Sequence, residues 1–174
     1  MKTKLFLGAF IFGFNCLQAQ STLKSDCENI TAENKILTTK IDSFYRASRS
    51  EINSRLKKTD RLTHGAKDPA NILPTYEEDW VYFGEILQKA KSHAKTLEDQ
   101  NVLIKQERKD IRAEGASVSD KEKENLSQGL DILSIDNDNS KGKLKEIRKN
   151  CQKLFKKSGK RLKKLKKLVA RNQK

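Results

Sequence analysis

Residues 80–111 carry a seam at alternating steps of three and four residues, and this repeat constrains the fold more than any other feature. The steps cover more than four heptads, a spacing typical of a helix that packs on partner helices with a left-handed twist. Two polar residues interrupt the seam, and we interpret them as register-setting or exposed positions. The seam consists of Trp80, Phe83, Leu87, Ala90, Ala94, Leu97, Asn101, Ile104, Arg108 and Ile111.

Start and stop signals place this helix between Pro74 and Gly115. Thr75 to Glu78 has the form of a capping box, and a glycine after the last seam residue ends a helix well. Both prolines of the chain lie within residues 63–74, so this stretch is predicted to be the one long loop.

Helical spacing extends over two other segments. One runs from about Thr22 to Leu62, and Gly65 marks its end. Another opens with a capping box from Ser119 to Glu122. Their seam residues are Leu23, Cys27, Ile30, Leu37, Ile41, Phe44, Ile52 and Leu56 in the former, and Leu126, Leu130 and Leu133 in the latter.

Residues 136–140 can be interpreted in two ways. The three–four spacing continues through them to Ser158, yet Asp-Asn-Asp-Asn-Ser followed by Gly142 is turn chemistry. In one unbroken helix Cys151 would lie about 48 Å from the helix start, too far from Cys27 for a disulfide. A reversal at 136–140 would return Cys151 to the height of Cys27. We therefore expect a break together with a Cys27–Cys151 disulfide, whereas an unbroken helix predicts free or intermolecular thiols.

The composition agrees with a helical fold that has a thin core. Charged residues make up 34% of the 174 residues and the mean hydropathy is −0.80, too polar for a thick core around a sheet. The predicted fold is all-α: an elongated antiparallel bundle of three to four helical segments with coiled-coil-like seams and a basic C-terminal helix. A homodimer is an open alternative, because a thin seam can also pair between chains.

Residues 1–19 have the pattern of a secretory signal peptide. Two lysines precede an uncharged apolar run of ten residues, and Ala19 gives a small residue at the expected cleavage point. Ten residues are too few to span a bilayer, which needs about 20. We expect a secreted, extracellular protein with a bundle body at 20–140 and a cationic helix or tail at 141–174. In an exported chain, Asn29 and Asn125 are candidate glycosylation sites.

Positive charge is concentrated in residues 141–174. This segment has 16 Lys and Arg and a single acid, Glu146, while the rest of the chain is close to neutral. Such a distribution excludes a uniformly basic nucleic-acid-binding domain. Lysine outnumbers arginine by 13 to 3, and lysine acts as a point charge where arginine forms forked, bidentate contacts. The segment is therefore expected to recognise charge density.

As a helix, the segment would be amphipathic. One face carries Leu154, Phe155, Ser158, Leu162, Leu165 and Val169. Bases cover the rest and are the predicted polyanion-binding residues. The partner we favour is an extracellular polyanion or anionic surface of the sulfated glycosaminoglycan type. These residues are Lys153, Lys156, Lys157, Lys160, Arg161, Lys163, Lys164, Lys166, Lys167 and Arg171.

Other interpretations of this segment remain open. A basic amphipathic helix can act on anionic lipid, a charged tail can simply solubilise a protein, and Ser158 to Arg161 resembles a dibasic processing site for a released peptide. The bundle could instead bind a specific host or partner protein, as salivary, venom or seminal effectors do.

The sequence predicts no enzyme activity, cofactor, metal site or small-molecule substrate. There are two histidines, and no HxxxH, CxxC, GxSxG or phosphate-loop spacing occurs. The acidic run 136–140 lacks the order of a calcium loop and a glutamate at its twelfth position.

Overall fold

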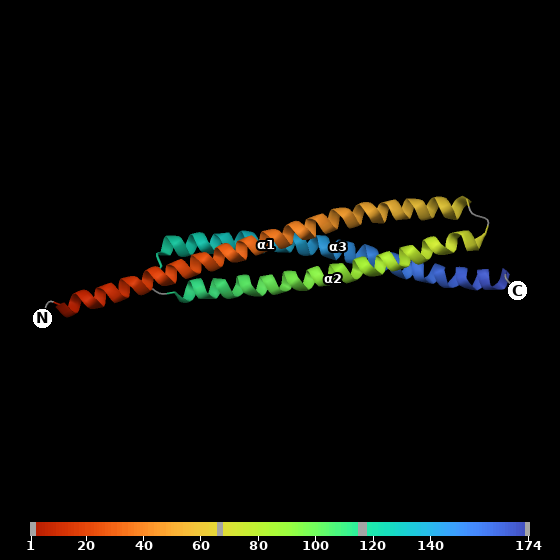
Figure 1. Cartoon of the computed structure of the whole chain (residues 1–174). Coiled ribbons are helices and arrows are strands. Elements are labelled where there is room, and N and C mark those ends of the chain that lie inside the picture. The colour runs from red at the N-terminus through yellow and green to blue at the C-terminus, as the bar shows by residue number, and fades with distance from the viewer. Residues whose placement is uncertain (1–2, 66–67, 115–117, 173–174) are drawn as a thin grey trace. The chain divides into compact units, whose positions relative to one another are not determined.

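The computed structural model describes the backbone of residues 3–65, 68–114 and 118–172, and the side chains of residues 22–64, 68–114 and 118–172. Three long α-helices pack together: α1 (Thr3–Gly65), α2 (Pro69–Ala113) and α3 (Asp120–Asn172), and no strand occurs in these ranges (Figure 1). The predicted all-α class is confirmed. The described ranges contain three helices, whereas the expected break would have given four helical segments.

The chain forms two compact units, and every helix contributes a segment to each. Unit 1 consists of Met1–Thr39 and Thr96–Asn139, and unit 2 of Lys40–Lys95 and Ser140–Lys174. The C-terminal basic segment thus belongs to one compact unit with parts of α1 and α2.

In unit 1, aliphatic residues from the three helices form the core. The segments of α1 and α2 are antiparallel, because Cys27 contacts Glu107 and Glu33 accepts a hydrogen bond from Gln100. The core cluster consists of Leu23, Cys27, Ile104, Ile111, Val118, Leu130 and Leu133. Nearly all of these are positions of the predicted seams.

Asparagines form a polar layer within unit 1. Asn34 of α1 and Asn137 of α3 are 1% and 0% exposed, and Asn137 Nδ2 donates to Asn101 Oδ1 of α2 at 2.9 Å. Among the described residues, no hydrogen-bond donor meets the side-chain oxygens of Asn34 and Asn137. A buried polar position of this kind restricts register and oligomeric state at some cost in stability.

In unit 2, α1 and α3 run parallel and α2 antiparallel to both. Asp42 pairs with Lys143 and Tyr45 with Glu146, each 101 residues further along the chain. The buried residues of this unit include Ile41, Ile52, Ile72, Tyr76, Phe83, Ile86, Ala90, Leu144, Ile147 and Cys151.

The predicted loop at 63–74 is largely helical, which corrects the expected start of α2 at Thr75. Asp68 caps the helix, since its Oδ1 accepts the amide hydrogen of Ala70 at 2.9 Å. Pro69 occupies the first helical position, where proline's missing N–H is not needed. Pro74 lies inside the helix.

The predicted break at 136–140 is also wrong, because α3 continues through these residues. Asn137 and Ser140 face the interior, so their polar side chains belong to the seam and do not form a turn. Cys27 and Cys151 are both free, buried thiols, so the structure has neither the predicted break nor the predicted disulfide between them.

The other helix boundaries agree better with the sequence. Ser119 caps α3, since its Oγ accepts the amide hydrogen of Glu122 at 3.4 Å, as the capping box predicted. The proposed stop at Gly115 lies outside the described residues. Helix α1 begins at Thr3, and so includes most of the candidate signal segment. Within the described ranges, none of the helices is both long and apolar enough to cross a membrane.

Candidate functional site

The basic segment of α3 is held in unit 2 by its apolar face. Leu144, Ile147 and Cys151 are fully buried, and Ser158 is buried further along the same face. Leu154, Phe155, Leu162, Leu165 and Val169 continue that face and are half-buried. The seam predicted for this segment therefore lies on the inner side of the helix.

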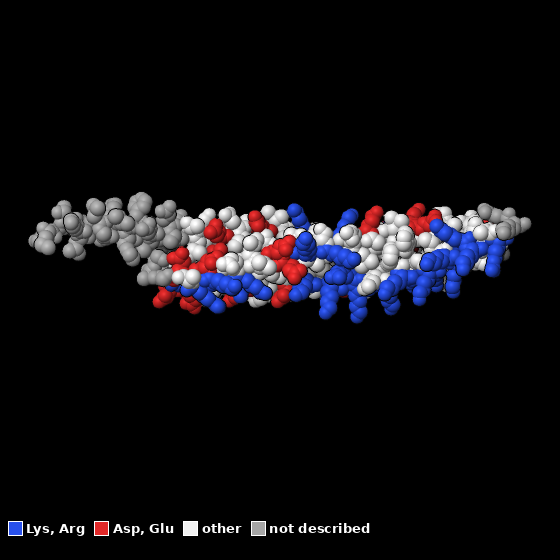
Figure 2. All heavy atoms as spheres, turned by 90° about the horizontal axis from the view of Figure 1, so that it is seen from below, with Lys and Arg blue, Asp and Glu red and all other residues white. Residues whose placement is uncertain are grey.

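All ten bases predicted to bind a polyanion are exposed. They are Lys153, Lys156, Lys157, Lys160, Arg161, Lys163, Lys164, Lys166, Lys167 and Arg171. Figure 2 shows lysine and arginine side chains in a dense row toward the C-terminal part of α3, with few acidic residues among them. The structure thus gathers these side chains on the outer surface of one helix.

Two of the ten bases have partners within the chain. Arg161 donates to the Tyr76 hydroxyl at 2.6 Å, with its guanidinium 5.8 Å from the centre of the tyrosine ring. Lys166 pairs with Glu77 at 2.8 Å. The other eight have no ion pair or side-chain hydrogen bond in the part of the chain that the structure describes. Like charges three or four positions apart on a helix repel, so this surface favours an incoming anion.

The charge of the chain divides between the two units. Unit 2 has 27 Lys and Arg against 9 Asp and Glu, a net charge of +18, while unit 1 has 10 against 14, a net charge of −4. The only acid of residues 141–174, Glu146, accepts a hydrogen bond from Tyr45 at 2.8 Å. The field around the α3 bases is therefore strongly positive.

A stacked aromatic pair joins α3 to α2. The rings of Trp80 and Phe155 lie 5.1 Å apart with an angle of 19° between their planes. Two glycines make the approach possible: a Cβ on Gly84 would lie 3.3 Å from Phe155, and one on Gly159 would lie 3.1 Å from the indole nitrogen. Trp80, predicted as a seam residue, remains 39% exposed beside the basic helix.

A buried carboxylate joins α1 to α2 in the same unit. Asp79 is 3% exposed and accepts hydrogen bonds from Thr59 at 2.6 Å and Arg55 at 3.2 Å. The Arg55 guanidinium also lies 4.3 Å from the centre of the Tyr82 ring. These contacts fix the α1 and α2 segments that flank the basic helix.

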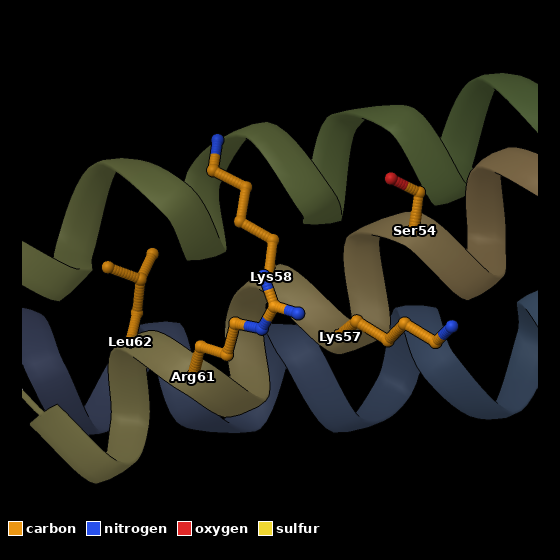
Figure 3. Close-up of a pocket in the computed structure, with 5 residues that line it drawn as sticks. All are labelled: Ser54, Lys57, Lys58, Arg61 and Leu62. Atoms are coloured by element: carbon orange, nitrogen blue, oxygen red, sulfur yellow. The ribbon is translucent and has the colours of Figure 1, made fainter.

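A basic depression on α1 was not predicted from the sequence. It has a volume of about 380 Å³ and is lined by Ser54, Lys57, Lys58, Arg61 and Leu62 (Figure 3). Lys58 points toward α2 and lies 3.7 Å from Glu78. In the sequence these bases form no run as long as that of residues 141–174, and their shared helical face is what marks the cluster.

The other candidate residues have no chemistry linked to the basic surface. Burial raises the pKa of the Cys151 thiol to about 11, and burial together with Glu107 raises that of Cys27 to about 12. Both thiols are therefore protonated at neutral pH. Asn29 and Asn125 are exposed. The described residues contain no group of three His, Cys, Asp or Glu side chains able to hold a metal ion.

No protein-family model, curated protein or solved structure matches the chain. The arrangement itself offers a row of exposed cations on one helix, suited to binding an extended anion by charge.

Proposed function

We propose that the protein is a secreted, non-enzymatic binder of extracellular polyanions of the sulfated glycosaminoglycan type. The observation that carries the proposal is the row of eight exposed α3 bases without an ion pair or side-chain hydrogen bond among the described residues. Export is inferred from the signal-like residues 1–19.

The length and composition of the row suit a linear, densely charged chain. Residues 153–171 extend over about 27 Å of helix, and bases occur on every turn. Because most are lysines, they attract many anionic groups without demanding one geometry at each. Binding should weaken steeply as salt screens the charges.

The orientation of the helix argues against lipid insertion as the main activity. An amphipathic helix enters a bilayer with its apolar face, and here that face packs inside unit 2. Only Leu168 among the large apolar residues of the basic segment is highly exposed, at 44%. Insertion would require α3 to leave the bundle.

A depression in unit 1 supports a second candidate function, the binding of a partner protein by the bundle. It has a volume of about 360 Å³, lies between α1 and α3, and is lined in part by Ala32, Leu126, Gly129 and Leu130. A Cβ on Gly129 would meet nothing within 4 Å, so the depression is open. This activity would be independent of the α3 lysines and of salt.

Two charge-matched variants test the proposal. In the first, Lys156, Lys160, Lys163 and Lys167 of α3 are changed to Gln, and in the second Lys24, Lys35, Lys105 and Lys109 of unit 1. All eight lysines are exposed, and each variant loses four charges. Binding is measured by elution from immobilised heparin in a salt gradient and by titration with soluble heparin.

The α3 variant should elute at much lower salt and lose affinity on the order of tenfold or more, whereas the unit 1 variant should behave like the wild type. Equal shifts for both variants would mean that net charge alone governs retention, and the proposal would fail. A protein that is not retained at all would also contradict it. Activity on a partner protein that survives in the α3 variant would favour the second candidate.

A further inference from the structure

The depression on α1 has the composition of an anion-binding site. Lys57 and Arg61 are four positions apart and therefore lie on the same helical face, with the Ser54 hydroxyl one turn before them. No acidic residue lines the depression. Figure 3 shows these side chains at the surface of α1.

Lys57 and Arg61 differ from the other bases around them in having no counter-ion. Arg55 pairs with Glu51 and Asp79, and Lys58 lies near Glu78. Among the described residues, Lys57 and Arg61 have no ion pair or hydrogen bond. Asp60, the acid next to Arg61 in the sequence, lies 3.8 Å from His64. Two like charges at this spacing repel, and a bound anion would remove that cost.

The depression borders the basic row of α3. Asp60 and Thr63 of α1 line a crevice together with Lys157 and Arg161 of α3. Lys57 lies three positions before Asp60 and is therefore its neighbour on the helix surface, so the α1 bases lie next to the edge of α1 that faces the α3 bases. Helices in contact have axes about 8–10 Å apart, a distance that one extended chain can cross.

We infer that Lys57, Arg61 and Ser54 form a second anion-binding site, which takes a sulfate or phosphate group of the polyanion bound by α3. The ligand then crosses from α3 to α1, and its affinity depends on a minimum chain length. This inference rests on the proposed function. Arginine suits a tetrahedral oxyanion because its guanidinium can donate two parallel hydrogen bonds.

The test compares the double variant Lys57→Gln/Arg61→Gln with a control, Lys109→Gln/Arg112→Gln, in unit 1. All four residues are exposed, and each variant loses one lysine and one arginine. Affinities are measured for size-defined heparin fragments from the disaccharide upward and, in a separate series, for polyphosphates of increasing length. Circular dichroism and melting curves establish that the variants are folded.

For long fragments, the α1 variant should bind several-fold more weakly than the wild type and the control; for the shortest fragments the three should be equal. The four-lysine α3 variant should lose affinity at every length. A length-dependent loss in only one series identifies the anionic group as sulfate or phosphate. If the α1 variant matches the wild type at all lengths in both series, the second site does not exist. If the wild type binds neither series, the proposed function itself is wrong.

Discussion

The two units share one architecture but differ in how their helices are held. Unit 1 has an aliphatic core with an asparagine layer and a net charge of −4, whereas unit 2 has a net charge of +18. Outside residues 1–19, every aromatic residue of the chain belongs to unit 2. Ring and cation contacts therefore concentrate where the basic helix must be retained.

This difference shows how a strongly charged helix can stay folded. The α3 bases repel one another, so the helix needs contacts that a plain aliphatic seam does not supply. In unit 2 these contacts are the Trp80–Phe155 stack and the Arg161–Tyr76 hydrogen bond, while the buried Asp79 pair fixes the α1 and α2 segments that flank the helix. Among the described side chains, each unit also contains one buried cysteine, Cys27 or Cys151, whose labelling reports on the opening of that unit.

The largest expected effect is that of Phe83→Ala in unit 2. Phe83 is 1% exposed, and its truncation should cost about 3–5 kcal/mol of unfolding free energy, as measured by urea denaturation. In single-cysteine proteins, labelling of Cys151 should accelerate more than labelling of Cys27. Leu130→Ala in unit 1 should show the opposite preference. Equal acceleration of both thiols would mean that the two units open as one.

Asp79→Asn should lower the free energy of unfolding by about 2 kcal/mol, because it leaves Arg55 without its buried partner. The exposed pair of Lys58 and Glu78 provides the control: Glu78→Gln should change stability by less than about 0.5 kcal/mol. Both variants are compared in urea melts. A cost for Asp79→Asn no larger than that of the control would show that polar contacts do not hold unit 2.

Asn137→Leu in unit 1 should raise stability by about 1 kcal/mol, because a buried amide with an unpaired oxygen is replaced by an apolar side chain. The variant should also form additional oligomers, which size-exclusion chromatography would detect. A loss of stability would indicate that the asparagine layer is fully satisfied by water.

The smallest expected effect concerns pH. Burial raises the pKa of Glu107, so the folded state holds this proton more tightly than the unfolded state. The wild type should therefore lose a little stability as the pH rises from the unfolded pKa through the folded one. Glu107→Gln removes this loss, and the variant should gain less than about 1 kcal/mol relative to the wild type above that range, and nothing below it. Urea melts at several pH values would reveal a constant difference if the residue does not titrate in this way.

Much of the fold could be predicted because the seams are regular. Phe83, Leu97, Ile104 and Ile111 are buried where the heptad spacing places them. The errors occurred where local chemistry and tertiary context disagree. Asn137 and Ser140 favour a turn by residue type, but their burial in the bundle keeps α3 helical. Pro69 suggested a loop, although with Asp68 as a cap it begins a helix.

For the candidate site, sequence reasoning found the part that is contiguous. The ten α3 bases stand out because they follow one another along the chain, and the structure exposes all of them. Lys57 and Arg61 could not be found in this way, because they belong to no long run of bases in the sequence. Their position beside α3 depends on the packing of helices that are a hundred residues apart.

The sharing of all three helices between the two units has a consequence for modularity. Neither unit is a continuous stretch of sequence, so no single cut or fusion junction yields the acidic or the basic part alone. A C-terminal deletion would remove one wall of unit 2 along with its lysines. Recombination, whether in evolution or in the laboratory, would have to exchange whole helices, and charge is therefore best altered one residue at a time.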